Sequence, residues 1–420
     1  MRNKLVLLLM ILFCSQPIWS KKILIPMSAN GQQEHLKAYG IAYIAIEAGL
    51  KVDWLLNYEG GAFAMDYNEA IVRTARLRGV NFNTLSDNKY IAIVNEVRSP
   101  SYNGDVILLE KAPKIAVYTP PNKVPWDDAV TMALEYAEIP YDKVYDNEVL
   151  DNALLKYDWL HLHHEDFTGQ FGKFWGAYQT ADWYIQDVRQ QEKMAKKHGF
   201  SKVSQLKLAV AHKIRDFVVG GGYLFAMCSA TDTYDIALAA EGVDICAIPF
   251  DGDPMDPLAQ EKLDFSKTFA FKDFELVKNP NEYEFSSIDN TNWRRVPKNL
   301  DYFTLFSFSA KSDPVPTMLT QNHTTTVKGF MGQTTAYRKE QIKSNVIIMG
   351  ENKAADEARY IHGNVGKGTF TFFGGHDPED YQHRVGDPHT ELALHPNSPG
   401  YRLILNNVLF PAAEKKPQKT

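Results

Sequence analysis

One stretch near the middle of the chain, residues 220–231, constrains the fold more than any other. Three glycines lead into five uncharged residues, 223–227, which is the pattern of a strand buried on both faces. Cys228 and several small residues follow, and a helix is predicted over 233–240. A strand, a nucleophile-type residue and a helix in immediate succession predict a nucleophile elbow. Such an elbow lifts the side chain out of the sheet, points the N–H groups of the helix start toward it and favours a thiolate.

The segments on either side of this elbow alternate between strand and helix patterns. In chain order they lie at 114–118, 127–137, 141–145, 147–155, 157–163, 205–219, 369–373 and 401–409. Alternation of this kind predicts parallel strands joined by right-handed crossovers. We therefore expect an α/β protein built on a doubly wound, mostly parallel, flavodoxin-like sheet.

The chain is predicted to contain a main domain over 113–410, preceded by an N-terminal α/β portion over 21–112. In the N-terminal portion, strands are expected at 22–27 and 52–56, and helices at 33–48, 69–77 and 89–97. Residues 250–343 are rich in Pro, Asn, Asp and aromatic residues, so an irregular, β-containing insertion in the main domain is expected there. The charged tail, 411–420, is predicted to be disordered.

The N-terminus has the layout of a secretory signal peptide. Two basic residues precede the apolar run 5–13, which is too short to span a bilayer, and cleavage is expected after residue 20. These features predict an exported, periplasmic protein without a transmembrane segment. A lipid anchor at Cys14 is disfavoured, because Phe13 stands where a lipoprotein signal needs a small residue.

Charge and cysteine content exclude some partners. The net charge is −6, and no run of Lys or Arg with interleaved aromatic residues is present, which argues against nucleic acid as a partner. Cys246 lies in the apolar segment 243–248, which is predicted to be a buried strand, so an inert core thiol is expected there. The sequence indicates no cofactor and does not define the oligomeric state.

A cysteine nucleophile needs a base near its sulfur and donors for the oxyanion. His376 follows a strand and two glycines, so it is expected at the carboxyl edge of the sheet, with Glu379 or Asp377 holding its far ring nitrogen. The backbone N–H of Ser229 and one N–H from the loop after residue 163 are the expected oxyanion donors. In the structural alternative, Cys228 is only a small residue at a tight turn, and His376 is a loop imidazole bound to a neighbouring aspartate.

A histidine-rich segment, 161–166, ends on the same edge of the predicted sheet. His164 and Glu165 are expected to line a polar pocket and contact the substrate, whereas His161 is expected in the core. Histidines of this segment and of 376–395 together offer metal ligands, but their spacing matches no recognised signature, so no metal is assigned. Aromatic residues in 167–184 suit either stacking on a sugar or packing against the sheet.

The elbow and the Gly-Gly-His loop resemble those of the class I glutamine amidotransferase-like superfamily, over about 113–409. The residues that carry the resemblance are 220–224 leading to Cys228, and His376-Asp377-Pro378-Glu379, which looks like the His-x-Glu end of that superfamily with one residue added. The Gly-Lys-Gly strand and the Gly-His loop are similar to those of its trehalose-utilisation-protein-like branch. The resemblance implies a flavodoxin-like sheet with a catalytic cysteine, histidine and glutamate. The elbow departs from the pattern at Ala230, where a glycine is usual.

The whole chain is also similar to a group of exported proteins commonly labelled asparagine synthetase B. That label does not fit the chemistry, because such an enzyme needs a cysteine after the initiator Met, and Arg2 stands there. A Ser-Gly-Gly-x-Asp-Ser pyrophosphate loop is also missing from the sequence. An ATP-dependent asparagine synthetase is therefore not expected.

Three functions follow from these features as hypotheses. The first is an exported cysteine hydrolase that acts on an amide or a related acyl substrate. The second is a non-catalytic carbohydrate or metabolite binding protein on the same scaffold, using 167–184 and 250–343. The third is a metal-dependent hydrolase that uses the histidine cluster. In each, the expected partner is a small-molecule substrate or a sugar.

Overall fold

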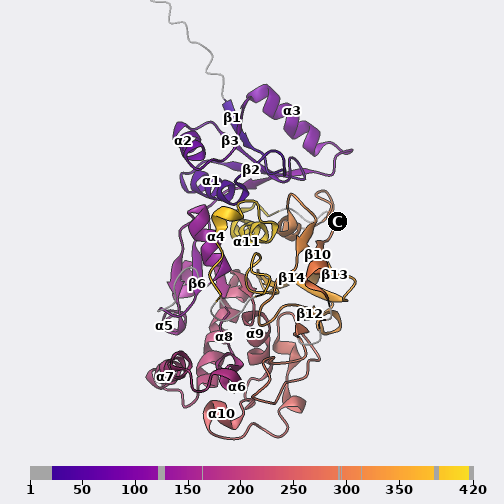
Figure 1. Ribbon diagram of the computed structural model, residues 1–420. Helices are drawn as coiled ribbons and strands as arrows, with labels where there is room; N and C mark the ends of the chain where they lie inside the picture. Colours follow the sequence, from indigo (N-terminus) through magenta and orange to yellow (C-terminus); the bar gives the residue numbers. More distant parts are fainter. Residues whose placement is uncertain are drawn as a thin grey trace, which may run out of the picture.

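The computed structural model describes residues 21–121, 128–162, 164–291, 294, 296–313, 315–382 and 387–415. These residues form two separate sheets with helices packed between and around them (Figure 1).

The N-terminal sheet is wholly antiparallel, with the strand order β4-β1-β3-β2-β5. Its strands are β1 (Lys21–Ile25), β2 (Val52–Leu56), β3 (Ala62–Asp66), β4 (Asn83–Ser86) and β5 (Asp105–Leu109). Its helices are α1 (His35–Glu47), α2 (Glu69–Leu77) and α3 (Asp87–Arg98). Asn68 and Ser86 begin α2 and α3 by accepting backbone N–H groups with their side chains. Strands β3, β4 and β5 were not expected from the sequence.

The second sheet has ten strands and mixed directions. Its parallel part has the order β15-β9-β8-β6-β7, with β6 (Ile115–Tyr118), β7 (Asp142–Val144), β8 (Trp159–Leu162), β9 (Tyr223–Met227) and β15 (Gly368–Phe373). Antiparallel strands extend it: β14 (Glu357–Val365), β13 (Ile347–Asn352), β10 (Tyr302–Leu305) and β11 (Thr326–Lys328), while β12 (Tyr337–Arg338) pairs with β14.

The predicted doubly wound, mostly parallel, flavodoxin-like sheet is therefore wrong. Among the described strands, nine of the thirteen pairings are antiparallel. The pairing in the larger sheet changes from parallel to antiparallel at the hairpin between β14 and β15. The turn of this hairpin requires glycine at 366, because φ is 60° and a Cβ would meet the carbonyl oxygen of Val219 at 2.6 Å. Strands from the predicted insertion then continue the sheet in the antiparallel sense.

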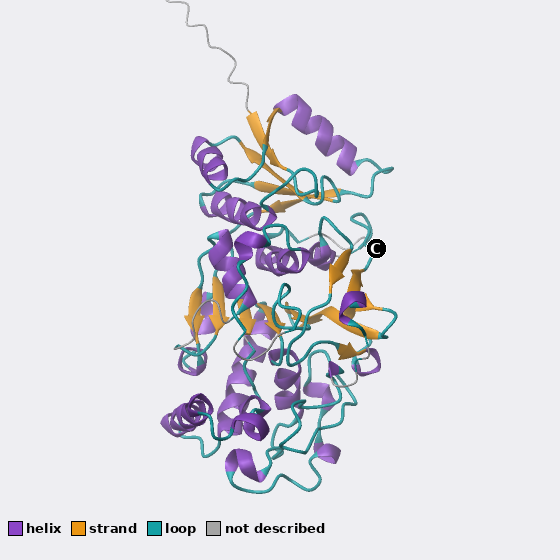
Figure 2. Cartoon of the chain, in the orientation of Figure 1, coloured by secondary structure: helices purple, strands orange, loops and turns teal. Residues whose placement is uncertain are grey.

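Two helical layers cover the larger sheet, as Figure 2 shows. Helices α4 (Ala129–Ala137) and α11 (Pro399–Leu409) lie on one face, and α1 packs against both and joins the two sheets. The other layer contains α5 (Asp146–Leu150), α6 (Trp175–Tyr178), α7 (Asp182–Lys197), α8 (Val203–Gly220), α9 (Ala230–Ala239) and α10 (Ile248–Asp251). The larger sheet packs against a hydrophobic core on each face. Strand β9 is buried on both faces, because Phe225 packs in the first core, with α4 and α11, and Leu224 packs in the second core, with α8 and α9. No described helix has the length and apolar character needed to cross a membrane.

The strand predicted at 243–248 is absent from the described structure. A turn occupies this segment instead, in which Asp244 Oδ1 accepts the backbone N–H of Cys246 at 2.9 Å, and α10 follows. The thiol of Cys246 is fully buried and donates to the carbonyl of Thr168 at 3.4 Å. Apolar content misled the prediction, since an Asp side chain that binds its own backbone favours a turn.

Candidate functional site

Cys228 lies at the junction of β9 and α9 with a left-handed backbone, φ 54°. For a residue with a Cβ this conformation costs about 1–2 kcal/mol. It is held by the surrounding hydrogen bonds: the N–H of Cys228 donates to the carbonyl of Gly375 at 3.1 Å, and Thr231 Oγ1 donates to the carbonyl of Cys228 at 2.7 Å. The junction therefore has the local geometry of an elbow and is tied to the loop after β15.

The sulfur of Cys228 is buried rather than lifted into solvent, and its residue is 2% exposed. Burial raises the pKa of Cys228 to about 11, although the backbone N–H groups of Gln333, Thr334 and Ser229 act in the opposite direction. The N–H of Gln333 lies 3.2 Å from the sulfur. In this conformation the thiol is protonated at neutral pH, so it becomes a nucleophile only with a base to take its proton.

Residues 331–335, here called the cover segment, lie over the thiol. Two backbone hydrogen bonds fix this segment to the loop after β15: His376 N–H donates to Met331 O at 2.8 Å, and Gly375 N–H donates to Thr334 O at 2.7 Å. A Cβ at Gly332 would meet His376 N at 2.7 Å, so the approach requires glycine. The cover segment explains why the expectation of an exposed sulfur is wrong.

Four of the predicted site residues lie together at the carboxyl ends of β8, β9 and β15. The imidazoles of His164 and His376 face each other with ring centroids 4.9 Å apart, and both residues are partly exposed. Ser229, the residue after Cys228, donates a hydrogen bond from its Oγ to the carbonyl of His164 at 2.8 Å. Hydrogen bonds therefore join the backbone on which this partly exposed imidazole pair stands to the elbow, at Cys228 and Ser229. Residue 163, after which the second oxyanion donor was expected, is outside the described part of the chain.

The described contacts of Glu379 and Asp377 lie elsewhere in the loop. Glu379 Oε2 is 3.2 Å from His395 Nδ1 and accepts the hydroxyl of Tyr381 at 2.7 Å. Asp377 Oδ1 accepts the hydroxyl of Tyr401 at 2.8 Å, and burial raises the pKa of Asp377. These contacts anchor the loop, and the predicted orienting role of either acid toward His376 stays a prediction.

Glu165 contacts a buried polar network that no sequence pattern indicated. Its Oε2 accepts the hydroxyl of Tyr145 at 3.2 Å. Lys207, which lies in α8 and is fully buried, donates to the same hydroxyl at 3.1 Å and to Asp146 Oδ1 at 3.1 Å. Burial raises the pKa of Tyr145 well above its usual value. The Tyr145 hydroxyl therefore connects Glu165, a predicted substrate-binding residue, to the buried ion pair of Lys207 and Asp146.

A second buried acid, Asp232, lies in the first turn of α9 beside the cover segment. It is fully buried, and its Oδ1 accepts the hydroxyl of Thr334 at 2.9 Å. Burial raises the pKa of Asp232 to about 7. Neither Asp232 nor the cover segment carried a sequence signal, because the residues that meet here are about a hundred positions apart.

The raised pKa of Asp232 predicts a specific pH dependence of stability. Between about pH 4 and pH 7 the folded state keeps a proton that the unfolded state has lost, so this contribution is full below pH 4 and disappears as the pH rises to 7. An Asp232→Asn variant lacks the carboxyl group and therefore this pH-dependent contribution to stability. We expect its unfolding free energy, relative to that of the parent protein, to rise by about 2 kcal/mol between pH 4.5 and 6.5 in denaturant titrations. Asp216→Asn, at a side chain 66% exposed, is the flat control, and a pH-independent difference for Asp232→Asn would contradict the assignment.

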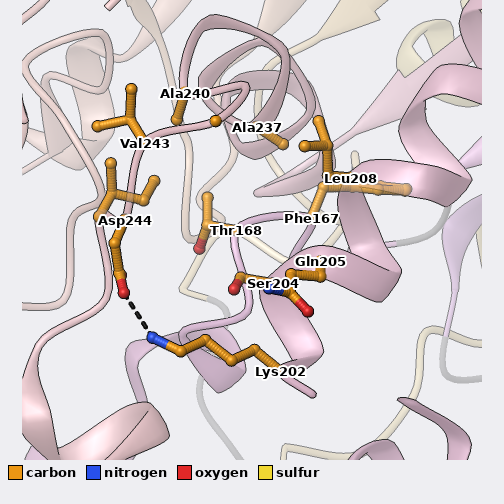
Figure 3. A pocket seen from close by; sticks show the side chains of 12 residues that line it. Phe167, Thr168, Lys202, Ser204, Gln205, Leu208, Ala237, Ala240, Val243 and Asp244 are labelled. Atoms are coloured by element: carbon orange, nitrogen blue, oxygen red, sulfur yellow. Dashed lines mark hydrogen bonds and ion pairs between the residues drawn. The ribbon is translucent and has the colours of Figure 1, made fainter. Parts of the chain in front are cut away.

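The histidines do not form a metal-ligating cluster among the described residues. The three potential metal ligands that do converge among the described residues are the side chains of Asp244, Cys246 and Asp251. Lys202 already supplies positive charge there, with Nζ 2.5 Å from Asp244 Oδ2 and 3.0 Å from Asp251 Oδ2. Lys202 and Asp244 line a cavity of about 300 Å³ near the start of α8. Figure 3 shows their ion pair among the side chains of that lining. His161 is a core residue, with Nε2 2.7 Å from Asp128 Oδ2.

The aromatic segment 167–184 packs largely on itself. Phe174 and Trp183 meet edge to face at 5.7 Å, and Tyr178 lies 5.2 Å from Trp183 between ring centroids. Trp183 remains 44% exposed. Most of these rings are therefore engaged in packing, and Trp183 presents the most open aromatic surface of the group.

Comparison with known proteins gives no family assignment. No family model matches the chain, and no curated protein matches it. Similar solved structures include Cytoplasmic Protein STM3548 from Salmonella typhimurium, with 11% identity and a TM-score of 0.33, and Cytoplasmic Protein STM1381 from Salmonella typhimurium LT2, with 12% identity and a TM-score of 0.37. Each alignment covers 72% of this chain and 100% of the other. Likeness at this level carries no argument about fold or function.

The expectation of export is not maintained. Both neighbours are titled cytoplasmic proteins, whereas this chain was expected to be exported and periplasmic, and export is not proposed further. Residues 1–20, on which the predicted signal peptide rests, lie outside the described part of the chain, as does Cys14. No location is assigned to the protein.

Proposed function

We propose that the protein is a cysteine hydrolase that acts on the amide or a related acyl group of a small molecule. The observation that carries the proposal is the left-handed backbone of Cys228, φ 54°, at a strand–helix junction. Strained residues of this kind cluster at active sites, because the surrounding structure must hold them there at a cost. The elbow also supports the proposed resemblance to the class I glutamine amidotransferase-like superfamily.

In the proposed reaction, Cys228 Sγ attacks the acyl carbon and passes its proton to the imidazole of His376. The C–N bond then breaks, the imidazole returns the proton to the leaving nitrogen, and water hydrolyses the thioester. The backbone N–H of Ser229, which lies at the sulfur, is the proposed donor to the oxyanion. His164 and Glu165 are proposed to contact the substrate from the partly exposed side.

The cover segment must move for a substrate to reach the sulfur. Its described ties to the loop after β15 are backbone hydrogen bonds, each of which contributes about 0.5–1.5 kcal/mol net. Buried side-chain hydrogen bonds, from Gln333 Nε2 to Gly172 O and from Thr334 Oγ1 to Asp232 Oδ1, also hold the segment, so the proposal requires all of these contacts to break together.

A second candidate function is that of a small-molecule binding protein without covalent chemistry. The observation that favours it is the burial of the Cys228 thiol, whose pKa is raised to about 11. In this version the partly exposed His164 and His376 bind a polar ligand, and the cysteine is a small residue at a tight turn.

The two candidates differ in their response to Cys228→Ala. We expect the parent protein to hydrolyse at least one member of a panel of primary amides, p-nitroanilides and p-nitrophenyl esters. Turnover should fall at least about a hundredfold in Cys228→Ala, because the nucleophile is removed, and remain in the matched control Cys246→Ala. Hydrolysis that persists in Cys228→Ala would contradict the proposal. A ligand-induced rise in Tm that survives in Cys228→Ala, without hydrolysis of any panel member by the parent, would favour the binding protein.

A further inference from the structure

Two neighbouring threonines tie the cover segment to two buried carboxyl groups. Thr334 Oγ1 donates to Asp232 Oδ1 at 2.9 Å, and the backbone N–H of Thr335 donates to Asp289 Oδ1 at 3.3 Å. Asp232 is fully buried, and Asp289 is 2% exposed. The backbone N–H of the preceding residue, Gln333, lies 3.2 Å from the thiol sulfur. The two carboxyl groups therefore hold the segment beside its contact with the thiol.

The cover segment is a compact turn with hydrogen bonds of its own. The N–H of Gly332 donates to Thr335 Oγ1 at 3.2 Å, and Thr335 Oγ1 donates to the carbonyl of Gly332 at 3.0 Å. These bonds lie within the segment, so they need not break when it moves as a unit. The bonds to Asp232 and Asp289 join the segment to the rest of the protein. Displacement of the segment therefore breaks them and admits water to both carboxyl groups.

A negative charge on Asp232 is poorly stabilised while the segment is closed. Its Oδ2 is buried and has no hydrogen-bond partner among the described residues. The titratable groups that interact with it are Asp166, Asp289, Cys228 and Tyr337, each of which is either neutral or negative. Burial raises the pKa of Asp232 to about 7, although hydrogen bonds to its carboxyl group act in the opposite direction.

Asp289 has similar surroundings. Its Oδ1 accepts the N–H and the hydroxyl of Thr291, at 2.9 and 2.5 Å, and its buried Oδ2 has no partner within the described part of the chain. The titratable groups that interact with it are Asp232, Glu284 and Tyr283. Burial, and then the charge of Asp232, raises the pKa of Asp289 well above its usual value. The closed form thus binds protons that water-exposed carboxyl groups release.

We propose that the cover segment is a pH-dependent gate, which is closed over Cys228 while Asp232 and Asp289 are protonated and opens as they ionise. A charged carboxylate accepts a hydroxyl more strongly than a neutral carboxyl does, but at Asp232 the penalty for burying the charge outweighs this gain. The closed form is therefore favoured most below about pH 4 and loses this advantage as the pH rises to 7. As regulation of the proposed hydrolase site, the inference rests on the proposed function, although movement of the segment is measured without substrate.

The test is hydrogen exchange of the full chain, measured by peptide mass spectrometry from pH 5 to pH 7. Protection of the peptide that covers 331–335 is calculated against the intrinsic exchange rate at each pH, which removes the direct effect of pH. In the parent protein we expect this protection to fall at least about tenfold over that range. Asp232→Asn keeps an acceptor for Thr334 but cannot ionise, so most of the fall should disappear. Asp216→Asn, at an exposed position of α8, should keep the fall seen in the parent.

A second variant tests the gate where Asp232→Asn alters folding. Thr334→Val removes the hydroxyl that joins the segment to Asp232, so it should lower the protection of 331–335 at pH 5 by about two- to tenfold. Constant protection in the parent from pH 5 to pH 7, or a fall of equal size in Asp232→Asn, would overturn the proposal. So would an equal fall in the peptide of β9, because it would indicate global unfolding. Hydrolysis is measured separately with Cys228→Ala, so the gate and the proposed function can each fail alone.

Discussion

Replacement of Arg402 by methionine is expected to lower the free energy of unfolding by about 3–5 kcal/mol. Arg402 is fully buried in α11. Its guanidinium donates to the backbone carbonyls of Met27, at 3.0 Å, and of Gly60. These carbonyls lie just after β1 and between β2 and β3, so one side chain joins the N-terminal sheet to the helix layer of the second sheet.

The other two acceptors of Arg402 are Tyr39 Oη at 2.9 Å and His323 Nδ1 at 3.2 Å. His323 stacks on His35 with ring centroids 4.4 Å apart, and burial and then Arg402 lower the pKa of His323 to about 3. Neutral imidazole is therefore the form that accepts from Arg402. Methionine fills much of the same volume but leaves several buried acceptors without a donor, which is the source of the expected loss.

Urea unfolding followed by tryptophan fluorescence and circular dichroism measures this effect. Arg73→Met, at an exposed position of α2, is the matched control and should change stability by less than about 0.5 kcal/mol. A loss below about 1 kcal/mol for Arg402→Met would show that the two sheets are joined mainly by other contacts, such as those of α1 with α4 and α11.

Lys207→Met is expected to cost a similar amount, about 3–5 kcal/mol, because it leaves the charge of Asp146 buried without its partner. The side chains of Lys207 and Asp146 are 1% and 0% exposed, and Nζ lies 3.1 Å from Oδ1. The hydroxyls of Tyr118 and Tyr145 also accept from Nζ, at 3.0 and 3.1 Å. The same denaturant titrations measure the loss, with Lys213→Met, at a partly exposed position of α8, as control.

A double-mutant cycle tests the cause of that loss. The double variant Lys207→Met/Asp146→Asn should lose about 1–3 kcal/mol less unfolding free energy than the sum of the two single variants. The reason is that Asp146→Asn removes the buried charge that Lys207→Met leaves without a partner. Additive losses would indicate that packing of the lysine stem, rather than the ion pair, stabilises this part of the second core.

The elbow was predictable from sequence because its signal is local. An uncharged strand, Cys228, small residues and a helix occur in one short run, and the structure places them as β9 and α9. Strand β9 reads as buried on both faces because both cores use it. The hairpin of β14 and β15 was predictable for the same reason, since Gly366 marks its turn between two apolar runs.

The direction of the strands was not predictable in the same way. Strand β4 is short and mostly polar, and β3 follows two glycines, so neither shows the pattern of a buried parallel strand. Strands β10 and β11 join the larger sheet from the irregular insertion, and β13, which follows the insertion, shifts its register against β14 at Gly350. Pairing of this kind is decided by contacts between distant segments, which local patterns do not encode.

The candidate site likewise combines residues that local sequence patterns indicated with a segment that they did not. His164, Ser229, Cys228 and His376 lie together because each follows a strand of the parallel part, and this edge was expected from the alternation of strands and helices. The cover segment, with the N–H of Gln333 on the sulfur, comes from the insertion and carried no motif. Its presence changes the expected exposed thiol into a closed one.

The central claim, that Cys228 is a nucleophile served by His376, is tested most directly by alkylation kinetics. Rates of iodoacetamide labelling of Cys228 and of the buried Cys246 are measured by peptide mass spectrometry from pH 5 to pH 10, in the parent protein and in His376→Gln. The account predicts that Cys228 reacts faster than Cys246, and that its rate rises at lower pH in the parent protein than in His376→Gln, because the imidazole takes the thiol proton. Labelling of Cys228 no faster than that of Cys246, rising only toward the thiol pKa of about 11, would contradict it.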